Sequence, residues 1–272
     1  MTEADLLART PSPATRASLA VQLHAAGLQP GAALLVHTSL SALGWIAGGP
    51  VAVIQALLDV VGPDGLVAMP AHSSDLTDPA LWQAPPVPTG WLDTLRREMP
   101  AYDAAITPTR RMGTVAELFR TWPGVRRSQH PTCSFAAIGP RAAGITAGHQ
   151  LEDPFGDASP LAKLLAADAD ILLLGVGFDA CTMLHLAELR AWPDRPRQPE
   201  ASPIIEDGQR VWKRFTQPAL LDPEHFLPVG QSLIDRGLAV RFEVGAGHGW
   251  RVSARTAVDH ALDLWRGTPP PG

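Results

Sequence analysis

Apolar residues follow two patterns along the chain: a helical spacing of about 3.6 residues and short uninterrupted runs typical of buried strands. ALLVHT at 33–38 predicts a strand. PVAVIQALLDVV at 50–61 predicts a helix that ends at Gly62, and GLVAMP at 65–70 predicts the next strand. This alternation indicates an α/β layer fold. Further helices are predicted at 14–27, 114–122, 140–147, 160–167, 180–191 and 253–265, and further strands at 134–139, 171–175, near 210–216 and near 238–244.

One segment interrupts the alternation. Residues 71–111 contain six prolines and three Trp or Tyr residues. Loops of this length are uncommon inside a domain and are usually functional, so we expect an ordered excursion over one face of the sheet. No boundary separates two hydrophobic cores. The chain is therefore predicted to be a single domain over 1–272, with residues 1–13 as a flexible tail.

The aliphatic run at 171–175 ends in GVGFDA, from Gly175 to Ala180, which matches the dinucleotide-binding pattern G-x-G-x-x-G/A. A dinucleotide fold also needs an acidic residue at the end of a second strand about 20 residues further on. That region here reads WPDRPRQPEASP, at 192–203, and its prolines exclude a central parallel strand. The glycines are therefore predicted to shape a tight strand-to-helix turn.

Three polar residues follow this turn at helical spacing. Thr182, His185 and Glu188 lie at i, i+3 and i+6, which places them on one helix face. Asp179 is positioned to cap the helix, and Pro193 to end it. A core-facing stripe rarely combines a hydroxyl, an imidazole and a carboxylate, and α/β sheets bind ligands at the carboxyl ends of their strands. The pattern indicates a site, with a core histidine and a capping threonine as the structural alternatives.

Charge and composition narrow the class of partner. The chain has 22 basic and 27 acidic residues, a net charge of −5, which argues against nucleic acid and permits a cationic substrate. No stretch approaches the roughly 20 apolar residues of a membrane span, and the N-terminus lacks an apolar signal core. The two cysteines form no C-x-x-C motif. We expect a cytoplasmic protein with reduced thiols and no membrane partner.

Several stretches, in their order and spacing, resemble the aminoglycoside N3-acetyltransferases, enzymes that modify antibiotics with acetyl-CoA. The resemblance runs from about residue 17 to 265. It is carried by LLVHTSLSALGWIAGG (34–49), MPAHSSDLTDPALWQAPPVP (69–88), WLDTLRREMPAYD (91–103), TPTRRMGTVAELFRTWPGVRRSQHPTCSFAAIG (107–139), SPLAKLL (159–165) and ILLLGVGFDACTMLHLAE (171–188).

The resemblance implies an α/β/α sandwich with a central, mostly parallel or mixed sheet, unlike the common acetyltransferase fold. It also implies acetyl-CoA-dependent acetylation of the 3-amino group of the 2-deoxystreptamine ring of aminoglycosides, with antibiotic resistance as the outcome. The sequence HQLEDPFGDASPL (149–161) and the pair Ala180-Cys181 depart from the family pattern. These departures concern the preferred antibiotic more than the reaction.

The implied reaction assigns roles to the polar helix face. An acceptor amine must lose a proton before it attacks a thioester, and a histidine suits that task, so His185 is expected to be the general base. A carboxylate should orient the ring, and Glu188 and Asp179 are both candidates. Thr182 is expected to donate a hydrogen bond to the thioester oxygen.

The resemblance also assigns binding residues. The loop after the first strand and the Arg pair before the helix at 114–122 are expected to hold the phosphates of acetyl-CoA. Carboxylates and an aromatic ring from the excursion and from the segment near 150 are expected to hold the cationic antibiotic. The coenzyme residues are Thr38, Ser39, Leu40, Ser41, Arg110, Arg111, Met112 and Gly113. The antibiotic residues are Asp75, Trp82, Asp103, His149 and Asp153.

Three alternatives remain open from the residues. One is an acetyl-CoA N-acyltransferase that acts on another amine. A second is a metal hydrolase, although the nine histidines form no H-x-H or H-E-x-x-H motif and no metal is expected. The third is a binding protein that has kept the fold without the activity. The sequence does not rank the aminoglycosides, and it leaves a monomer and a homodimer equally open.

Overall fold

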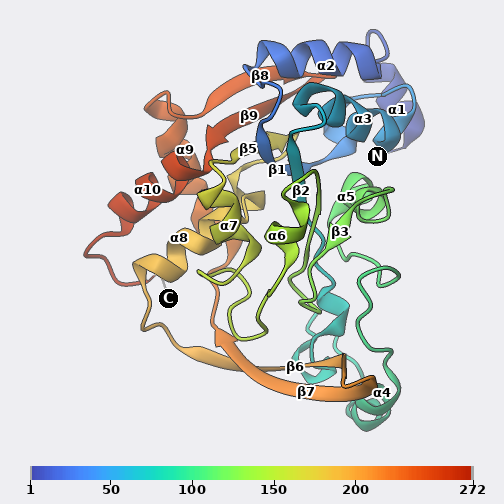
Figure 1. The fold of residues 1–272 in the computed structure, drawn as a ribbon, viewed down its shortest axis with the longest axis vertical. Coiled ribbons are helices and arrows are strands. Elements are labelled where there is room, and N and C mark those ends of the chain that lie inside the picture. The colour runs from blue at the N-terminus through green and yellow to red at the C-terminus, as the bar shows by residue number, and fades with distance from the viewer. Residues whose placement is uncertain (1, 271–272) are drawn as a thin grey trace.

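The central layer of the computed structural model, which describes residues 2–270, is a seven-stranded mixed sheet (Figure 1). Its strand order is β3-β4-β2-β1-β5-β9-β8. β2, β1 and β5 are parallel to one another, and the outer strands pair antiparallel. The strands are β1 (Ala33–Thr38), β2 (Leu66–Pro70), β3 (Arg126–Arg127), β4 (Phe135–Ile138), β5 (Asp170–Leu174), β8 (Val240–Val244) and β9 (Gly247–Ser253).

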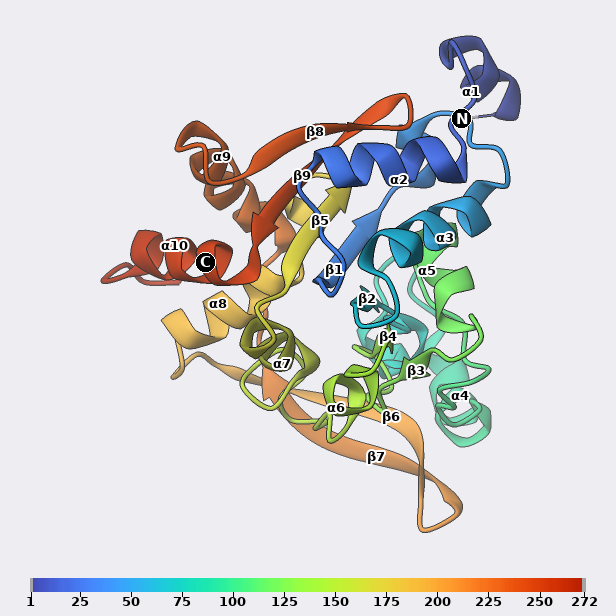
Figure 2. The ribbon, with the colours of Figure 1, turned by 45° about the horizontal axis from the view of Figure 1, so that its top comes forward.

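Helices cover both faces of this sheet, as Figure 2 shows. One face carries α2 (Arg16–Ala25), α3 (Gly49–Val61) and α5 (Gly113–Arg120). The other carries α6 (Ala142–Thr146), α7 (Pro160–Ala166), α8 (Met183–Ala191), α9 (Leu227–Asp235) and α10 (Ala254–Trp265). Each face of the sheet has its own hydrophobic core: the first lies under α2, α3 and α5, and the second under α6 to α10. Along β1, Leu34 and Val36 point into the first core, whereas Ala33 and Leu35 point into the second. The α/β/α sandwich with a mixed sheet is therefore confirmed.

The N-terminal residues differ from the expected flexible tail. Glu3–Arg9 form helix α1, which Thr2 and Asp5 stabilise by a reciprocal capping box. The Arg9 guanidinium donates to the backbone carbonyl of Ser41, which ties α1 to the loop after β1. Met1, also part of the predicted tail, lies outside the described residues. Local capping and this contact explain why residues 3–9 are helical.

A separate two-stranded ribbon projects from the sandwich at the bottom of Figure 1. It consists of β6 (Arg197–Glu206) and β7 (Gln209–Pro218), which pair antiparallel. The sequence excluded a central parallel strand near 192–203, and β6 indeed lies outside the central sheet. A strand forms there nonetheless. In a two-stranded ribbon each strand has one edge that pairs with no other strand, so a proline, which has no N–H to donate, is tolerated.

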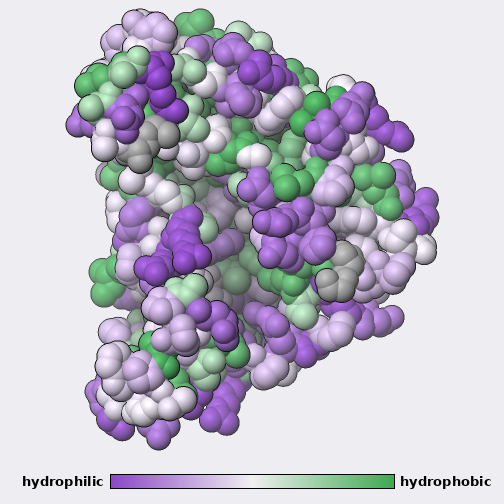
Figure 3. Space-filling model, turned by 180° about the vertical axis from the view of Figure 1, so that it is seen from behind, coloured by the Kyte–Doolittle hydropathy of each residue, from purple (hydrophilic) through white to green (hydrophobic). Residues whose placement is uncertain are grey.

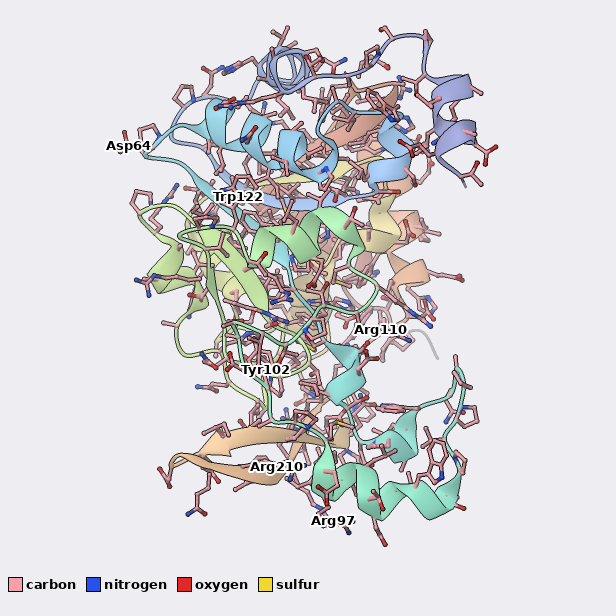
Figure 4. All side chains as sticks on the ribbon, turned by 90° about the vertical axis from the view of Figure 1, so that its right-hand side faces the viewer. Asp64, Arg97, Tyr102, Arg110, Trp122 and Arg210 are labelled. Carbon is pink, nitrogen blue, oxygen red and sulfur yellow. The ribbon has the colours of Figure 1, made fainter. Side chains whose placement is uncertain are left out.

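The Pro- and Trp-rich excursion is ordered and packs against this ribbon. It contains three short 3-10 turns and helix α4 (Leu92–Glu98). The backbone N–H of Tyr102 donates to the Pro203 carbonyl at 2.8 Å. Arg210 extends from the ribbon to the α4 end of the excursion (Figure 4), where it donates to the carbonyl oxygens of Met99 and Arg96 at 2.7 and 2.6 Å. These contacts join the excursion and the ribbon.

Candidate active site

A cleft of about 1220 Å³ opens at the carboxyl ends of the three parallel strands. Its wall includes Thr38 at the end of β1, Pro70 at the end of β2 and Val176 just after β5. Figure 3 shows the surface hollowed between the upper part of the molecule, which carries the N-terminal helices, and the lower part, which carries the ribbon. The volume exceeds that of a typical pocket for one small ligand, about 300–1,000 Å³.

The turn after β5 brings a polar helix to this cleft. Gly175 has φ 68°, and a Cβ there would lie 2.6 Å from Ala42 Cβ, so only glycine allows this close approach to the loop after β1. A 3-10 turn, η5 (Phe178–Ala180), follows before α8 begins. Asp179 therefore lies inside this turn and does not cap α8. The N-cap position belongs to Thr182, whose side chain makes no capping hydrogen bond.

His185 and Glu188 form a buried pair at the cleft wall. His185 Nδ1 donates to Glu188 Oε1 at 3.1 Å, and the histidine lines the cleft whereas Glu188 is fully buried behind it. A hydrogen bond at Nδ1 fixes the ring orientation and leaves Nε2 as the nitrogen that can accept a proton. Between Glu188 and Asp179, the two carboxylates considered from the sequence, it is Glu188 that contacts the ring.

Glu188 is itself held from several sides. The backbone N–H of Leu221 donates to both carboxylate oxygens, at 3.2 and 3.3 Å. Arg195 Nη1 forms an ion pair with Glu188 Oε1 at 3.0 Å, and both side chains are buried. A buried carboxylate is stable as an anion only with such partners. Arg195, which the sequence analysis did not select, supplies a cationic partner for this buried carboxylate.

Aromatic rings sandwich the imidazole. Phe155 stacks on His185 with ring centroids 4.8 Å apart and an interplanar angle of 13°, and Phe226 meets it edge-on at 4.8 Å. His72 also contacts Phe155, with ring centroids 5.4 Å apart. Burial lowers the pKa of His72 to about 3, and the neighbouring His185 adds to that shift. The base candidate thus has little freedom to rotate away from the cleft.

Thr182 also lines the cleft, next to His37 at the end of β1. The Thr182 hydroxyl lies 3.4 Å from His37 Nε2. Burial lowers the pKa of His37 to about 3, so its imidazole is neutral near pH 7. The contact joins α8 to β1, and Thr182 has this partner in place of the capping role considered from the sequence.

The upper part of the cleft has the features of an anion site. The predicted coenzyme residues Thr38–Ser41, Arg111, Met112 and Gly113 line it. The N-terminal ends of α3 and α5 also face it, at Gly49 and Gly113. Arg111 has φ 59°, a conformation that non-glycine residues rarely adopt outside special turns. Of the expected coenzyme set, Arg110 is the member that does not line the cleft.

Arg110 is paired with one of the predicted antibiotic residues. Its Nε lies 3.2 Å from Asp75 Oδ1, and both side chains are at least half exposed. Neither residue belongs to the cleft wall. The two charges satisfy each other at the surface, so the predictions of a phosphate contact for Arg110 and of an antibiotic contact for Asp75 are not supported by their positions.

The remaining predicted antibiotic residues also lie off the cleft wall. Asp103 caps a local turn by accepting from the Ala105 N–H at 2.7 Å, and Asp153 accepts from the Ala158 N–H at 2.9 Å. The Trp82 indole donates to Thr77 Oγ1 at 3.0 Å. His149 is buried, and its Nε2 donates to the Pro154 carbonyl at 2.8 Å. These side chains serve local structure, which residue type alone does not reveal.

The sequence analysis did not select several polar residues that line the cleft, among them His72, Glu200 and Gln217. Glu200 and Gln217 are buried and come from the ribbon. His72 Nε2 and Gln217 Oε1 are buried polar atoms without a hydrogen-bond partner among residues 2–270. A signal was available for Glu200, since a carboxylate inside the proline-rich stretch QPEASP has no obvious structural purpose.

The part of the chain that the structure describes contains neither a cluster of metal-binding side chains nor a helix that could cross a membrane. No group of three or more His, Cys, Asp or Glu side chains is placed to hold a metal ion between residues 2 and 270. Over the same range, the helices are all too short or too polar to cross a membrane.

Comparison with known proteins places the chain among acetyltransferases. Residues 35–266 match the family described as aminoglycoside 3-N-acetyltransferase. The chain is 44% identical over 253 residues to the SPbeta prophage-derived aminoglycoside N(3')-acetyltransferase-like protein YokD of Bacillus subtilis, covering 93% of this chain and 92% of that protein. It is 38% identical over 281 residues to aminoglycoside N(3)-acetyltransferase VII of Streptomyces paromomycinus, covering 96% and 95%.

Solved structures give the same picture. The crystal structure of YokD from Bacillus subtilis matches with a TM-score of 0.94 at 42% identity, over 97% of this chain and 98% of that chain. AAC-IIIb in a binary complex with CoASH matches with a TM-score of 0.83 at 32% identity, over 96% and 100%. AAC-VIa bound to sisomicin matches with a TM-score of 0.85 at 29% identity, over 96% and 100%.

Proposed function

The chain belongs to the aminoglycoside 3-N-acetyltransferase family, and we propose that its cleft acetylates the 3-amino group of an aminoglycoside with acetyl-CoA, using His185 as the general base. The observation that carries this proposal is the His185–Glu188 pair, which presents an oriented imidazole to a cleft large enough for two substrates. The complexes of AAC-IIIb with CoASH and of AAC-VIa with sisomicin support the choice of substrates.

The chemistry asks for one proton transfer. The acceptor amine attacks the carbonyl carbon, so a C–N bond forms and the C–S bond of the thioester breaks. His185 Nε2 takes the proton that the amine loses as the C–N bond forms. The imidazolium then gives this proton to the departing thiolate, so His185 returns to its neutral form and the charge balances. A positioned base of this kind contributes roughly 10²–10⁴-fold. Glu188 stabilises the imidazolium that forms, because its carboxylate accepts the Nδ1–H hydrogen bond.

Thr182 is proposed to stabilise the negative charge that develops on the carbonyl oxygen. Its hydroxyl lies at the cleft wall one turn before His185 on α8. For this role the neutral His37 donates from Nε2, at 3.4 Å, to the Thr182 oxygen, which leaves the Thr182 O–H to donate to the carbonyl oxygen. A preorganised donor in a site with little water acts more strongly than one in bulk solvent.

The binding of acetyl-CoA is assigned to the upper part of the cleft. The residues present fit its phosphates, because Arg111 and the N-terminal ends of α3 and α5 line that part together with the small residues of the loop after β1. When bound there, acetyl-CoA supplies the activated acetyl group. The loop and Arg111 are expected to hold its phosphates, and Met112 to contact its apolar portion.

The test is a thiol-release assay with acetyl-CoA and a panel of aminoglycosides, half of them carrying a 3-amino group and half lacking it. We expect CoA release with the first half only, and a mass increase of one acetyl group at the 3-amino nitrogen. Release that ignores the 3-amino group, or acetylation at a different nitrogen, would show that the acceptor is another amine. The absence of turnover with every member would overturn the proposal.

A second candidate is an acetyl-CoA N-acyltransferase that acts on a different amine. Asp75, Asp103 and Asp153 lie away from the cleft wall, so the carboxylates that a cationic acceptor would meet there are Glu3, Asp179 and Glu200, and these are compatible with either acceptor. The same panel separates the two candidates.

A further inference from the structure

Strand β8 forms one edge of the central sheet. β9 pairs with one side of this strand, and helix α2 packs over one of its faces. Figure 2 shows β8 as the outermost strand, beyond β9. Within residues 2–270 no strand pairs with its other side. An unpaired edge presents a row of N–H and C=O groups that a further strand can bind.

The backbone groups that face this open edge belong to Arg241 and Glu243. The two-residue turn between β8 and β9 is closed by the pair Val244 and Gly247, and such a closing pair is hydrogen-bonded. Counting back from Val244, every second residue of β8 therefore bonds to β9. The N–H and C=O groups of Arg241 and Glu243 point outward, and no backbone group among the described residues bonds to them there.

The side chains of β8 alternate between the two faces of the sheet. Phe242 and Val244 belong to the core under α2. Arg241 and Glu243 point to the opposite face, with side chains 52% and 67% exposed, and Arg241 Nη1 lies 2.9 Å from Glu243 Oε1. The exposed face of the strand thus carries one positive and one negative charge, placed symmetrically about Phe242.

The sequence of β8, VRFEV, is complementary to itself when two copies run antiparallel. With a two-fold axis at Phe242, Val240 lies opposite Val244 of the second copy, and Arg241 lies opposite Glu243 of the second copy. Opposite charges directly across an antiparallel pair stabilise it, whereas like charges destabilise it. The residues of each charged pair are also those whose backbone groups face outward, so both N–H···O bonds of the pair can form.

The flank of α2 that lies beside this edge carries small side chains. Gln22 Oε1 accepts from the backbone N–H of Gly245 at 2.8 Å, which identifies the flank nearest to the end of β8. Ser18 and Ala25, at i−4 and i+3 from Gln22, lie on the same flank, and both are exposed. Two α2 helices related by the axis can therefore approach each other above the paired strands.

We propose that the open edge of β8 docks a second copy of this chain, which adds its own β8 antiparallel with the axis at Phe242. The two seven-stranded sheets then continue as one. Each copy contributes the same residues, so the interface is isologous and closes as a dimer. The cleft lies at the ends of β1, β2 and β5, so each copy keeps an open cleft. The inference does not depend on the acetyl transfer proposed above.

The test is sedimentation velocity of the full chain over concentrations from roughly 1 to 100 µM, because an interface of one short strand pair is expected to be of micromolar strength. With rising concentration the wild type should shift from 28.9 kDa toward twice that mass. Arg241→Glu sets carboxylates opposite each other at both charged pairs, and Glu243→Arg does the same with guanidinium groups. Each should raise the dimer dissociation constant at least about tenfold.

The variant that combines Arg241→Glu with Glu243→Arg exchanges the two charges, so it should regain the wild-type dissociation constant. Arg97→Glu is the matched control. Arg97 is also an exposed arginine beside a glutamate, Glu98, but it lies on α4 at the bottom of Figure 4. This control should dimerise like the wild type, and circular dichroism checks that every variant is folded.

Glu243→Pro tests the backbone contribution. Proline has no N–H, but the N–H that is lost at this position points outward and not to β9, so the monomer should fold. This variant should sediment as a monomer at every concentration. Glu243→Gln keeps the N–H and loses the charge without adding repulsion, so it should dimerise less than about tenfold more weakly than the wild type.

A wild type that stays monomeric at roughly 100 µM would overturn the inference, since even a weak interface is populated there. Dimers that survive either charge reversal, or the proline substitution, would also overturn it, because the contact would then lie elsewhere. If both reversals abolished the dimer and the exchange of charges failed to restore it in a folded protein, the pairing of Arg241 with Glu243 would be refuted.

Discussion

Glu188 connects three residues at the back of the cleft, since His185, Arg195 and the Leu221 N–H all contact its carboxylate. For the general-base role that we propose for His185, the arrangement separates two requirements. Burial among Phe155 and Phe226 holds the ring in place, while the carboxylate stabilises the charge that the ring gains. Because Arg195 and Leu221 remain as partners, Glu188 is not left unpaired when His185 is replaced.

His185→Ala should therefore fold and lose catalysis. We expect kcat/KM to fall at least ~10²-fold, as for the removal of a general base. The thiol-release assay measures the loss, and circular dichroism checks the fold. His248→Ala, an exposed histidine on β9, is the control and should keep wild-type turnover. Near-normal turnover of His185→Ala would contradict the assignment of the base.

Two neighbouring arginines give a second test at this scale, because Arg111 lines the cleft and Arg110 is paired with Asp75 outside it. Arg111→Ala should raise the KM for acetyl-CoA by roughly tenfold, as for the loss of a charged contact, and change the KM for the acceptor much less. Arg110→Ala should alter neither by more than about twofold. Steady-state kinetics with each substrate varied in turn would decide, and equal effects of Arg111→Ala on both substrates would exclude the phosphate role.

The residue scale also shows how far sequence reasoning reached. The contact between His185 and Glu188 follows from helical spacing, which is a local property that a sequence displays. Asp103 and Asp153 looked equally suitable as substrate carboxylates, yet each caps a nearby backbone N–H. Whether a carboxylate caps a turn or faces a cleft depends on the path of the chain around it, and residue type does not encode that path.

At the scale of elements, the sequence predicted the strands that consist of uninterrupted apolar residues. It did not predict elements that contain several glycines or prolines. The prediction at 33–38 coincides with β1, and that at 171–175 with β5 to within one residue. β9 reads GHGWRVS and α9 reads LPVGQSLID, and neither shows a clear periodicity. Their structure comes from tertiary contacts: β9 pairs with β5 and β8, and α9 packs into the second core.

Gly230 illustrates why α9 carries a residue that disfavours helices. A Cβ at this position would lie 2.2 Å from Phe178 Cγ, so α9 can pack this closely against the η5 turn only with glycine at position 230. Gly230→Ala should lower the free energy of unfolding by about 1–3 kcal/mol, as overpacking does. It should also reduce turnover, because η5 leads directly into Thr182 and α8. Urea unfolding and the thiol-release assay measure the two effects.

Gly144→Ala in α6 is the matched control, since nothing lies within 4 Å of a Cβ placed there. Alanine in a helix interior should stabilise by about 0.5–1 kcal/mol. If both alanine variants raised the stability, the close packing of α9 on η5 would not be what requires glycine at position 230.

On the scale of the whole molecule, the cleft lies between two parts with different constraints. The sandwich supplies the paired imidazole and the anion-binding loop, and two hydrophobic cores fix both. The ribbon supplies Glu200 and Gln217 to the cleft wall, and it contacts the excursion through Tyr102 and Arg210. Residues of the ribbon can therefore change without altering the contacts that hold His185 and Glu188 together.

Buried histidines couple the stability of the whole fold to pH. Burial lowers the pKa of His149 to about 4, against 6.5 for the free side chain, and lowers those of His37 and His72 to about 3. His149 accepts from the Ser128 hydroxyl at Nδ1 and donates to the Pro154 carbonyl at Nε2, which suits its neutral form. Between pH 6.5 and 4 the unfolded chain binds a proton at this position that the folded chain does not.

The free energy of unfolding should therefore fall as the pH falls through this window, by up to about 1.4 kcal/mol per pH unit for each such histidine. The stability contributed by the neutral His149 is fully present above pH 6.5, and it is lost progressively as the pH falls toward the pKa of His149 in the folded protein. His149→Gln should be less stable at every pH but should show a smaller slope, whereas the exposed His248→Gln should keep the wild-type slope. Urea titrations at pH 7.5, 6.5, 5.5 and 4.5, values chosen to span about three pH units across the window, measure these slopes. Equal slopes in His149→Gln and the wild type would mean that His149 is protonated in the folded state, and the neutral hydrogen-bonded arrangement would then have to be abandoned.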